Sequence, residues 1–274
     1  MKILIAADME GATGVTNWDR VTPGHPEYAR FRRLMTGDIN AAVRGAFDGG
    51  AAEVVVTDGH WNGSNILVEE LDPRAKLNAG TTAPLSMMQG IDQEVDAVVF
   101  IGYHARHGTA EAVLDHTWSS SCVQNLWLNG KVAGEYSLNA ALAGHHAAPV
   151  LLASGDQSVC AQIAAMLPGV TGVEVKHATG RFSAECLPPV VTAELIEQGT
   201  KLAVQKLRRK EAPAPYRLIT PIQVTVEFKA SDMADRAGAM TGSTRSDLKV
   251  SITAPDMPAA YRGFEVMVEL ARHG

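Results

Sequence analysis

The stretch that decides the fold is KILIAADMEG, residues 2–11. Five apolar residues in a row, residues 3–7, predict a strand that is buried on both faces. Asp8 and Glu10 follow two residues apart, so both side chains point to the same side, and Gly11 then allows a sharp turn. Two carboxylates at the rim of a buried strand are costly unless a positive charge compensates them. A metal ion is the obvious candidate for that charge.

The alternation of strand and helix continues through most of the chain. A helix over residues 27–47 follows the first strand, and residues 53–57 form the next buried strand. This strand–helix–strand unit predicts a parallel pair with a right-handed crossover. Further strands are expected at residues 97–103, 149–153 and 173–176, and further helices at 136–145, 156–167 and 189–209. The predicted fold class is α/β, a mostly parallel sheet flanked by helices.

A different pattern begins after a proline-containing linker at residues 210–215. Residues 222–228 alternate between apolar and polar side chains, as a half-exposed antiparallel strand does. Helices at 231–236 and 257–272 and a strand at 249–253 are expected to complete the chain. We therefore expect an α/β metal-binding catalytic domain over residues 1–210 and a smaller α+β domain over residues 211–274.

The middle of the chain carries one strong hairpin signal. Asn129-Gly130 separates residues 123–128 from residues 131–133, which are expected to pair as neighbouring strands. Residues 114–121, which precede this hairpin, are expected to be extended as well.

Composition narrows the range of possible functions. The chain has 274 residues, 46% of them hydrophobic and 20% charged, which allows a globular protein with a sizeable core. The formal net charge is −6 at pH 7 and there is no basic tract, which argues against a nucleic-acid partner. We expect neither a signal peptide nor a membrane span. The three cysteines lack CxxC spacing and are expected to be reduced thiols of a cytoplasmic protein: Cys122, Cys160 and Cys186.

Acidic and histidine side chains follow the ends of three predicted strands. Asp8 and Glu10 come after the first strand, His60 after the second and His104 after the third. Because ligands of open α/β sheets gather beyond the carboxyl ends of the strands, we expect these side chains to meet at one edge. Glu135, just past the hairpin, could join them. Oxygen and nitrogen donors without thiolates suit zinc or another borderline divalent ion.

Five such donors exceed what one tetrahedral zinc ion needs. We expect two metal ions about 3.5–4 Å apart, bridged by one carboxylate and a water. Asp8, deepest on the central strand, is the expected bridge, with Glu10 and His60 on one metal and His104 and Glu135 on the other. Each residue alone has an ordinary interpretation, as a helix cap, a helix-entry residue or a hydrogen-bonding histidine. Their shared edge favours the metal site.

Three further residues are candidates for supporting roles. His116 could act as a general acid or base or stabilise an oxyanion, although alone it would be a surface histidine. Asp58 could orient a ligand imidazole, or be an ordinary Asp-Gly turn residue. Asn139, four residues after Glu135, lies on the same helical face. It could hydrogen-bond a substrate or a ligand, or be a buried, satisfied amide.

These motifs together resemble the M55 family of metallopeptidases, the D-aminopeptidases of the DppA type. The similarity spans nearly the whole chain, and its ordered motifs are Asp8-Met9-Glu10-Gly11, Asp58-Gly59-His60, Gly102-Tyr103-His104-Ala105-Arg106, Gly134-Glu135 and Leu138-Asn139-Ala140. The resemblance implies two zinc ions per subunit, with Asp8 as the bridge and Glu10, His60, His104 and Glu135 as the other ligands. It also implies that His116 is catalytic. Finally, it implies a homo-oligomeric ring, in its specific form a ring-shaped decamer, that encloses the sites.

Site and resemblance together predict a cytoplasmic, zinc-dependent aminopeptidase. It would hydrolyse the N-terminal residue, D-configured by resemblance, of short peptides or amino-acid amides through a metal-activated water. Manganese or cobalt would accept the same donors as zinc. Two alternatives stay open: a dinuclear-metal amidohydrolase with a non-peptide substrate, and a non-catalytic small-molecule binding protein. The binding protein would need no metal.

Overall fold

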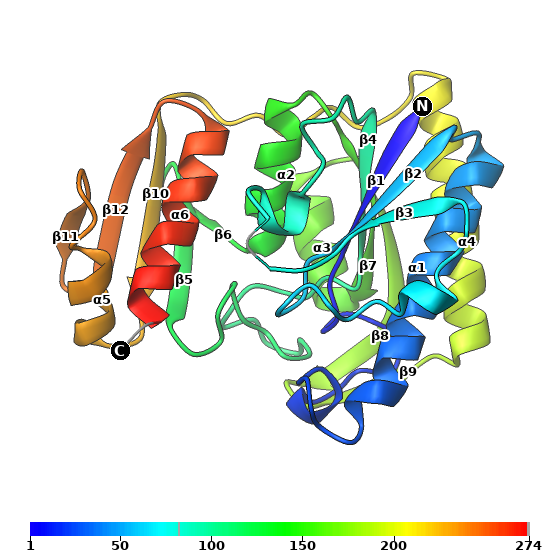
Figure 1. Cartoon of the computed structure of the whole chain (residues 1–274), viewed down its shortest axis with the longest axis horizontal. Helices are drawn as coiled ribbons and strands as arrows, with labels where there is room; N and C mark the ends of the chain where they lie inside the picture. Colours follow the sequence, from blue (N-terminus) through cyan, green and yellow to red (C-terminus); the bar gives the residue numbers. More distant parts are fainter. Residues whose placement is uncertain (82, 273–274) are drawn as a thin grey trace.

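The computed structural model describes residues 1–81 and 83–272, which form two β-sheets lying side by side (Figure 1). The larger sheet has seven strands in the order β3 (Ala75–Asn78), β2 (Glu53–Asp58), β1 (Lys2–Ala7), β4 (Ala97–Ile101), β7 (Val150–Asp156), β8 (Thr171–Gly180) and β9 (Ser183–Cys186). The strand pairs of this sheet are parallel except β8 with β9. The predicted α/β class with a mostly parallel sheet is therefore confirmed.

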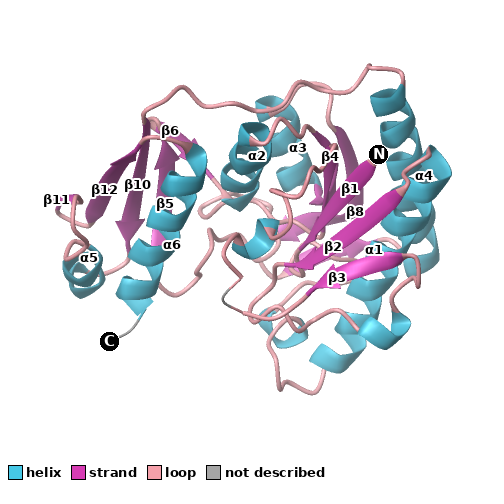
Figure 2. Cartoon of the chain, turned by 45° about the horizontal axis from the view of Figure 1, so that its top comes forward, coloured by secondary structure: helices cyan, strands magenta, loops and turns pink. Residues whose placement is uncertain are grey.

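Helices cover both faces of the seven-stranded sheet (Figure 2). One face packs against α1 (Tyr28–Gly49) and α4 (Pro189–Arg208), and the other against α2 (Glu135–His145) and α3 (Gln157–Met166). Because successive side chains of a strand point to opposite faces, Ile3 belongs to the first layer of core and Leu4 to the second. Two buried faces explain why residues 3–7 are apolar without alternation.

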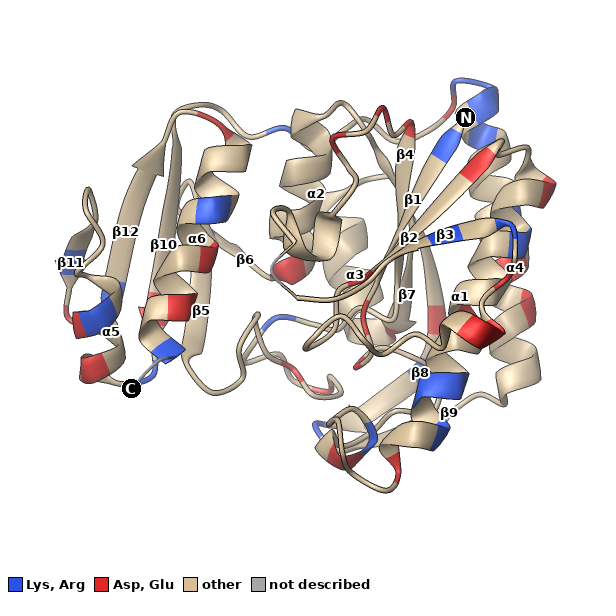
Figure 3. Ribbon diagram, in the orientation of Figure 1, with Lys and Arg blue, Asp and Glu red and all other residues tan. Residues whose placement is uncertain are grey.

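Charged residues lie at the ends of the inner strands β1 and β2 and not in their middle (Figure 3). Helix α1 combines a buried apolar side, which includes Met35 and Ile39, with an exposed side that includes Arg33.

No helix in the described part of the chain has both the length and the apolar character needed to cross a membrane.

The second sheet has five antiparallel strands in the order β11 (Thr244–Ser246), β12 (Lys249–Ala254), β10 (Ile222–Phe228), β5 (Val123–Leu128) and β6 (Lys131–Ala133). The predicted hairpin joins β5 to β6, and its turn residues Asn129 and Gly130 have φ angles of 48° and 75°. Helices α5 (Ser231–Ala237) and α6 (Met257–Arg272) complete this part. Because β5 and β6 come from the middle of the chain, the sheet combines strands from both sides of residue 210. The division into residues 1–210 and 211–274 stays a prediction.

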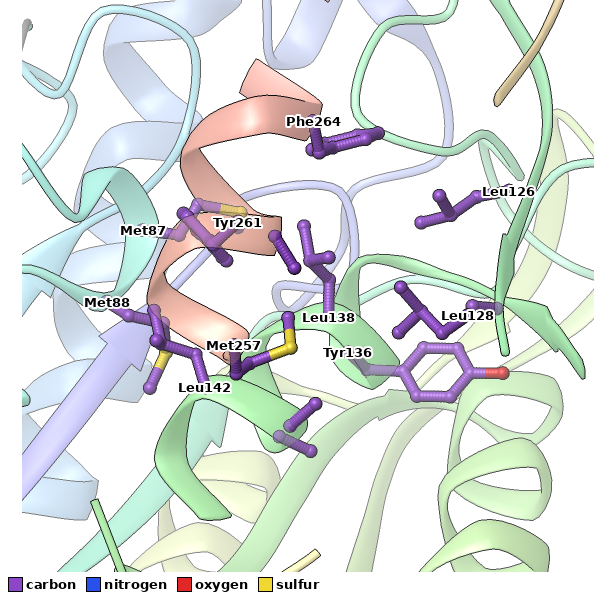
Figure 4. Packing of buried hydrophobic residues seen from close by; sticks show 14 of the residues in the cluster. Met87, Met88, Leu126, Leu128, Tyr136, Leu138, Leu142, Met257, Tyr261 and Phe264 are labelled. Atoms are coloured by element: carbon purple, nitrogen blue, oxygen red, sulfur yellow. The ribbon is translucent and has the colours of Figure 1, made fainter. Parts of the chain in front are cut away.

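One continuous apolar core joins the two parts of the molecule (Figure 4). It combines side chains of α2, of α6, of β5 and of the short helix η3 (Ser86–Met88), among them Met87, Met88, Leu126, Leu138, Leu142, Met257, Tyr261 and Phe264. This packing holds α2 between the two sheets. The first residue of α2 is Glu135, a predicted site residue.

The structure differs from the sequence patterns in two respects. Residues 114–121 form turns, so the predicted extended stretch is wrong; Leu114 and Trp118 have φ angles of 51° and 62°, outside the strand region. Strands β3, β9 and β11 are not predicted by the patterns, and each forms an edge of its sheet. Edge strands are short and partly exposed, so they lack the apolar run or the clean alternation that marks an inner strand.

Candidate metal centre

Three neighbouring strands end at the same level of the larger sheet. Ala7 of β1 lies opposite Asp58 of β2 and Ile101 of β4, so the chain leaves all three strands at one edge. The loop after β1 runs close against the segment after β4: a Cβ atom on Gly11 would overlap the carbonyl oxygen of Tyr103. Only glycine fits at that position without a backbone shift.

Beyond this edge the structure brings together six of the predicted side chains, all of them buried: Asp8, Glu10, His60, His104, His116 and Glu135. They form two groups of three residues. Within each group the donor atoms lie within 4.8 Å of one another. The first group consists of Asp8, Glu10 and His60, and the second of the other three. Sequence reasoning placed His116 near the metals as a catalytic residue, and the structure puts it inside the second group.

The first group is built around the imidazole of His60. Its Nδ1 lies 3.3 Å from Asp8 Oδ1 and 3.1 Å from Glu10 Oε2. Its Nε2 lies 2.8 Å from the carbonyl oxygen of Val21, which therefore accepts the Nε2 proton and leaves Nδ1 facing the two carboxylates.

The second group is built around the carboxylate of Glu135. Its Oε1 lies 3.0 Å from His104 Nε2 and 3.6 Å from His116 Nε2. The two imidazole rings stack in parallel, with centroids 3.9 Å apart and an interplanar angle of 10°. Glu135 also accepts a hydrogen bond from the backbone N–H of Trp118, at 2.5 Å, which orients the carboxylate.

Asp8 connects the two groups. Its Oδ1 faces His60, and its Oδ2 lies 3.4 Å from Nε2 of His104 in the second group. A carboxylate that presents one oxygen to each group stands where a bridging ligand would stand. This arrangement agrees with the bridge predicted from the depth of Asp8 on the strand.

Three atoms of these groups favour a bound cation. Asp8 Oδ2, Glu10 Oε2 and His104 Nε2 are buried and make no hydrogen bond. Lone pairs that face one another at 3.0–3.4 Å repel unless a proton or a cation lies between them. Neighbouring ligand atoms of a tetrahedral zinc ion lie about 3.4 Å apart, which matches this spacing. The donor set therefore fits divalent metal ions.

The electrostatics of the site lead to the same conclusion. Burial and the charge of Glu10 raise the pKa of Asp8 to about 7. Burial would lower the pKa of His104, but the charges of Glu135 and Asp8 raise it to about 10. Burial would likewise lower the pKa of His60, and Glu10 and Asp8 raise it well above its usual range. The site holds an excess of negative charge that attracts protons, and a metal ion would satisfy it equally.

Comparison with known proteins relates this geometry to a family. Residues 1–266 match peptidase family M55, described as D-aminopeptidase. The chain belongs to the M55 peptidase family. A D-aminopeptidase of Bacillus subtilis (strain 168) is 34% identical over 274 residues, 99% of this chain and 98% of that protein. The solved structure of the Zn-dependent D-aminopeptidase DppA from Bacillus subtilis, a self-compartmentalizing protease, has a TM-score of 0.96 and 33% identity, covering 100% of this chain and 99% of its own. The predicted family and its peptidase activity class are confirmed.

In this M55 peptidase the carboxylate of Asp58 forms hydrogen bonds with backbone groups and not with an imidazole. Its carboxylate accepts hydrogen bonds from the backbone N–H groups of Asn65, at 2.6 Å, and Ile66, at 2.8 Å, and from the Asn65 side chain. Asn65 in turn donates to the carbonyl oxygen of His60. Asp58 therefore holds the loop after His60, whereas the ring is oriented by Val21. In the described part of the chain no hydrogen bond joins Asp58 to the ring of His60 or His104.

Asn139 of the M55 peptidase lies one turn after Glu135, as predicted, but it is fully buried and its amide has partners. Nδ2 donates to the hydroxyl of Tyr103 at 2.9 Å, and Oδ1 accepts from the hydroxyl of Tyr261 at 3.0 Å. Tyr103 precedes His104, and Tyr261 belongs to α6. Asn139 therefore links the site to the smaller part of the molecule and is not placed to bind a substrate directly.

This role of Asn139 predicts a loss of stability without a loss of metal. Asn139→Ala leaves two buried hydroxyl groups unpaired, so we expect the free energy of unfolding to fall by about 1–3 kcal/mol. The metal content should equal that of the unmodified protein. Urea unfolding measures the first quantity and elemental analysis the second. Unchanged stability, or a variant that folds but has lost its metal, would contradict this assignment.

Residues that contact the site and that sequence reasoning missed include Trp18, Val21 and Lys176. Trp18 packs edge-on against His116, with ring centroids 5.4 Å apart. Trp18 and Val21 lie in the polar loop between the first strand and the first helix. This loop follows directly after Asp8 and Glu10, and that position is the only sequence feature that could have indicated these two residues. Lys176 lies far away in the sequence and has no such signal.

Proposed function

We propose that this chain is a zinc-dependent aminopeptidase that removes the N-terminal residue, D-configured, from short peptides or amino-acid amides. Its family and the D-aminopeptidases it resembles support the reaction and the substrate. The observation that carries the proposal is the pair of buried donor groups connected by Asp8. Carboxylates and imidazoles in this arrangement are ligands that zinc prefers.

The proposal assigns two zinc ions to the centre. Asp8 would contact both ions, Glu10 and His60 would hold one, and His104 and Glu135 the other. Zinc ions in such a site lower the pKa of a bound water to about 7, which supplies a nucleophile at neutral pH. The burial of all five side chains supports this assignment, because buried charges are otherwise costly.

His116 is the residue that we assign to proton transfer. Its Nδ1 lies 2.8 Å from the carbonyl oxygen of Leu114, so Nδ1–H donates there and Nε2 is the free nitrogen. Nε2 lies 3.6 Å from Glu135 Oε1 and 3.9 Å from Glu10 Oε1. Burial and the charge of His104 lower the pKa of His116 to about 4. A neutral Nε2 can accept a proton and pass it to the leaving amine.

We also propose that the chain works in the cytoplasm as a homo-oligomer, in the form of a ring-shaped decamer. The similar DppA structure, which is described as self-compartmentalizing, supports the oligomer. Sites enclosed by a ring would admit short peptides and exclude folded proteins. A ring that encloses the sites therefore agrees with the short peptides and amino-acid amides that we propose as substrates.

Hydrolysis of D-alanyl amide, with and without a chelator, tests the proposed activity. We expect the purified protein to release D-alanine, to lose this activity when its metal is removed, and to regain it when zinc is added back. A panel of D- and L-aminoacyl amides and dipeptides measures the preference for configuration. We expect a higher kcat/KM for the D members of each pair.

Two outcomes would contradict the aminopeptidase proposal. A protein that contains divalent metal but cleaves no member of the panel would favour an amidohydrolase with a non-peptide substrate. A protein without metal and without sensitivity to chelators would favour a small-molecule binding protein. Elemental analysis of the protein as purified separates these two cases.

A further inference from the structure

Lys176 is a lysine of β8 with an exposed fraction of 1%. Its Nζ donates three hydrogen bonds to backbone carbonyl oxygens: to Glu10 at 2.7 Å, to Ala12 at 2.9 Å and to Val15 at 2.8 Å. An ammonium group has three N–H donors, so all of them are used. Among the described residues Lys176 forms no ion pair within 4.0 Å. Its partners are carbonyl groups of a single loop.

That loop leaves β1 and carries Glu10 of the candidate metal centre. Other elements fasten it as well: the backbone N–H and the Oγ1–H of Thr13 donate to the carboxylate of Asp38 in α1, at 2.9 and 2.8 Å. Oγ1 of Thr13 also lies 2.8 Å from Oγ1 of Thr192 in α4. Strand β8 and helices α1 and α4 therefore hold the loop together.

The ammonium group of Lys176 has a role that the hydrogen bonds of Thr13 cannot replace. Three buried carbonyl oxygens that point at one place repel one another unless a donor or a cation lies between them. Lys176 supplies both, and so it draws the carbonyls of Glu10 and Val15 toward one point. Because one of these carbonyls belongs to Glu10 itself, the ammonium group also fixes the backbone from which the carboxylate extends.

We propose that Lys176 is a positioning residue of the metal centre, which holds the loop so that the Glu10 carboxylate faces His60. Glu10 Oε2 lies 3.1 Å from His60 Nδ1 in this arrangement. The inference rests on the proposed zinc centre. It adds an asymmetry to that centre: the group of Asp8, Glu10 and His60 depends on this loop, whereas the group of His104, His116 and Glu135 comes from other segments.

Zinc titration of a Lys176→Met variant tests the inference. Methionine has a similar length but neither charge nor donors. We expect the affinity of one zinc position to fall about 10- to 100-fold, as for other residues that orient metal ligands, while the second position keeps its affinity. Competition with a chromophoric chelator, starting from metal-free full-length protein, measures both affinities. Circular dichroism of the same samples reports whether the variant is folded.

Two further variants separate positioning from general stability. Val173→Ala shortens a buried side chain of the same strand, which packs close to Gly199 of α4 and forms none of the hydrogen bonds that hold the loop. It should lower the melting temperature and leave both zinc affinities unchanged. Lys176→Gln keeps two N–H donors and should retain more of the affinity than Lys176→Met. It also provides the comparison if the methionine variant does not fold.

Folded Lys176 variants with both zinc affinities unchanged would overturn the inference. An equal loss of affinity in Val173→Ala would overturn it too, because the loss would then follow from stability alone. A parent protein that binds no zinc would be a different result: it would overturn the proposed metal centre, and the role of Lys176 with it.

Discussion

Replacement of Asp8 by alanine is expected to remove both zinc ions from the protein. The two oxygens of this carboxylate face different groups, Oδ1 toward His60 at 3.3 Å and Oδ2 toward His104 at 3.4 Å. No other side chain of the site presents one oxygen to each of these histidines. Without Asp8, each zinc ion keeps only two of the three ligands that we assign to it, fewer than the three protein ligands of a catalytic zinc site. We expect kcat/KM to fall by at least about 10³-fold, since metal stabilisation of the transition state contributes several kcal/mol.

Elemental analysis after gel filtration measures the zinc content of the Asp8→Ala variant. Asp19→Ala is a matched control: this aspartate belongs to the same loop region, but its side chain is 63% exposed. The control should keep both zinc ions and full activity. Two zinc ions per chain in Asp8→Ala would sink the bridging assignment, whatever happened to the activity.

His116→Gln is expected to lower kcat by about 10²- to 10⁴-fold, the usual contribution of a positioned acid or base, and to leave the zinc content unchanged. The free Nε2 of His116 lies 3.6 Å from Glu135 in its own group and 3.9 Å from Glu10 in the other group. Glutamine preserves a polar side chain there but cannot carry a proton between water and the leaving amine. KM should change little, because the proposed role lies in the chemical step.

Zinc content decides between two roles for His116. His116 could also be a metal ligand, because it lies in the second group together with His104 and Glu135. In that case His116→Gln would lose one zinc ion. That outcome would contradict the proton-transfer assignment. His107→Gln is the control, since His107 lies in the same loop and its Nδ1 is 4.0 Å from Asp115 and not part of either group. It should keep both the zinc content and kcat.

Much of the fold could be predicted because its inner strands are recognisable one at a time. Strands β1, β2, β4 and β7 contain apolar runs long enough to be buried on both faces. Helices indeed cover both faces of the sheet that these strands form. The edge strands β3, β9 and β11 could not be found in this way. Their pairing depends on a neighbour that is distant in sequence, and their own side chains are partly exposed.

The convergence of four of the predicted donors, Asp8, Glu10, His60 and His104, could also be anticipated, because parallel strands in register end at a common edge. The place of His116 could not. It lies between Leu114 and Trp118, two residues with positive φ angles, so the chain turns sharply there and the extended pattern expected for this segment does not apply. Turns of this kind bring the ring onto His104 and depend on the surrounding loops.

By itself the sequence determined the parallel sheet and the edge at which its acids and histidines gather, since apolar runs and the polar residues that end them are local features. Only the tertiary structure decided the burial of Lys176. Simple alternation with Val173 and Val175 would place that lysine in solvent. Strand β8, however, has one extra residue beside β7: Gly155 pairs with Glu174 and Asp156 with Lys176, and both Val175 and Lys176 are buried. Such a register shift belongs to a pair of strands, and no single strand encodes it.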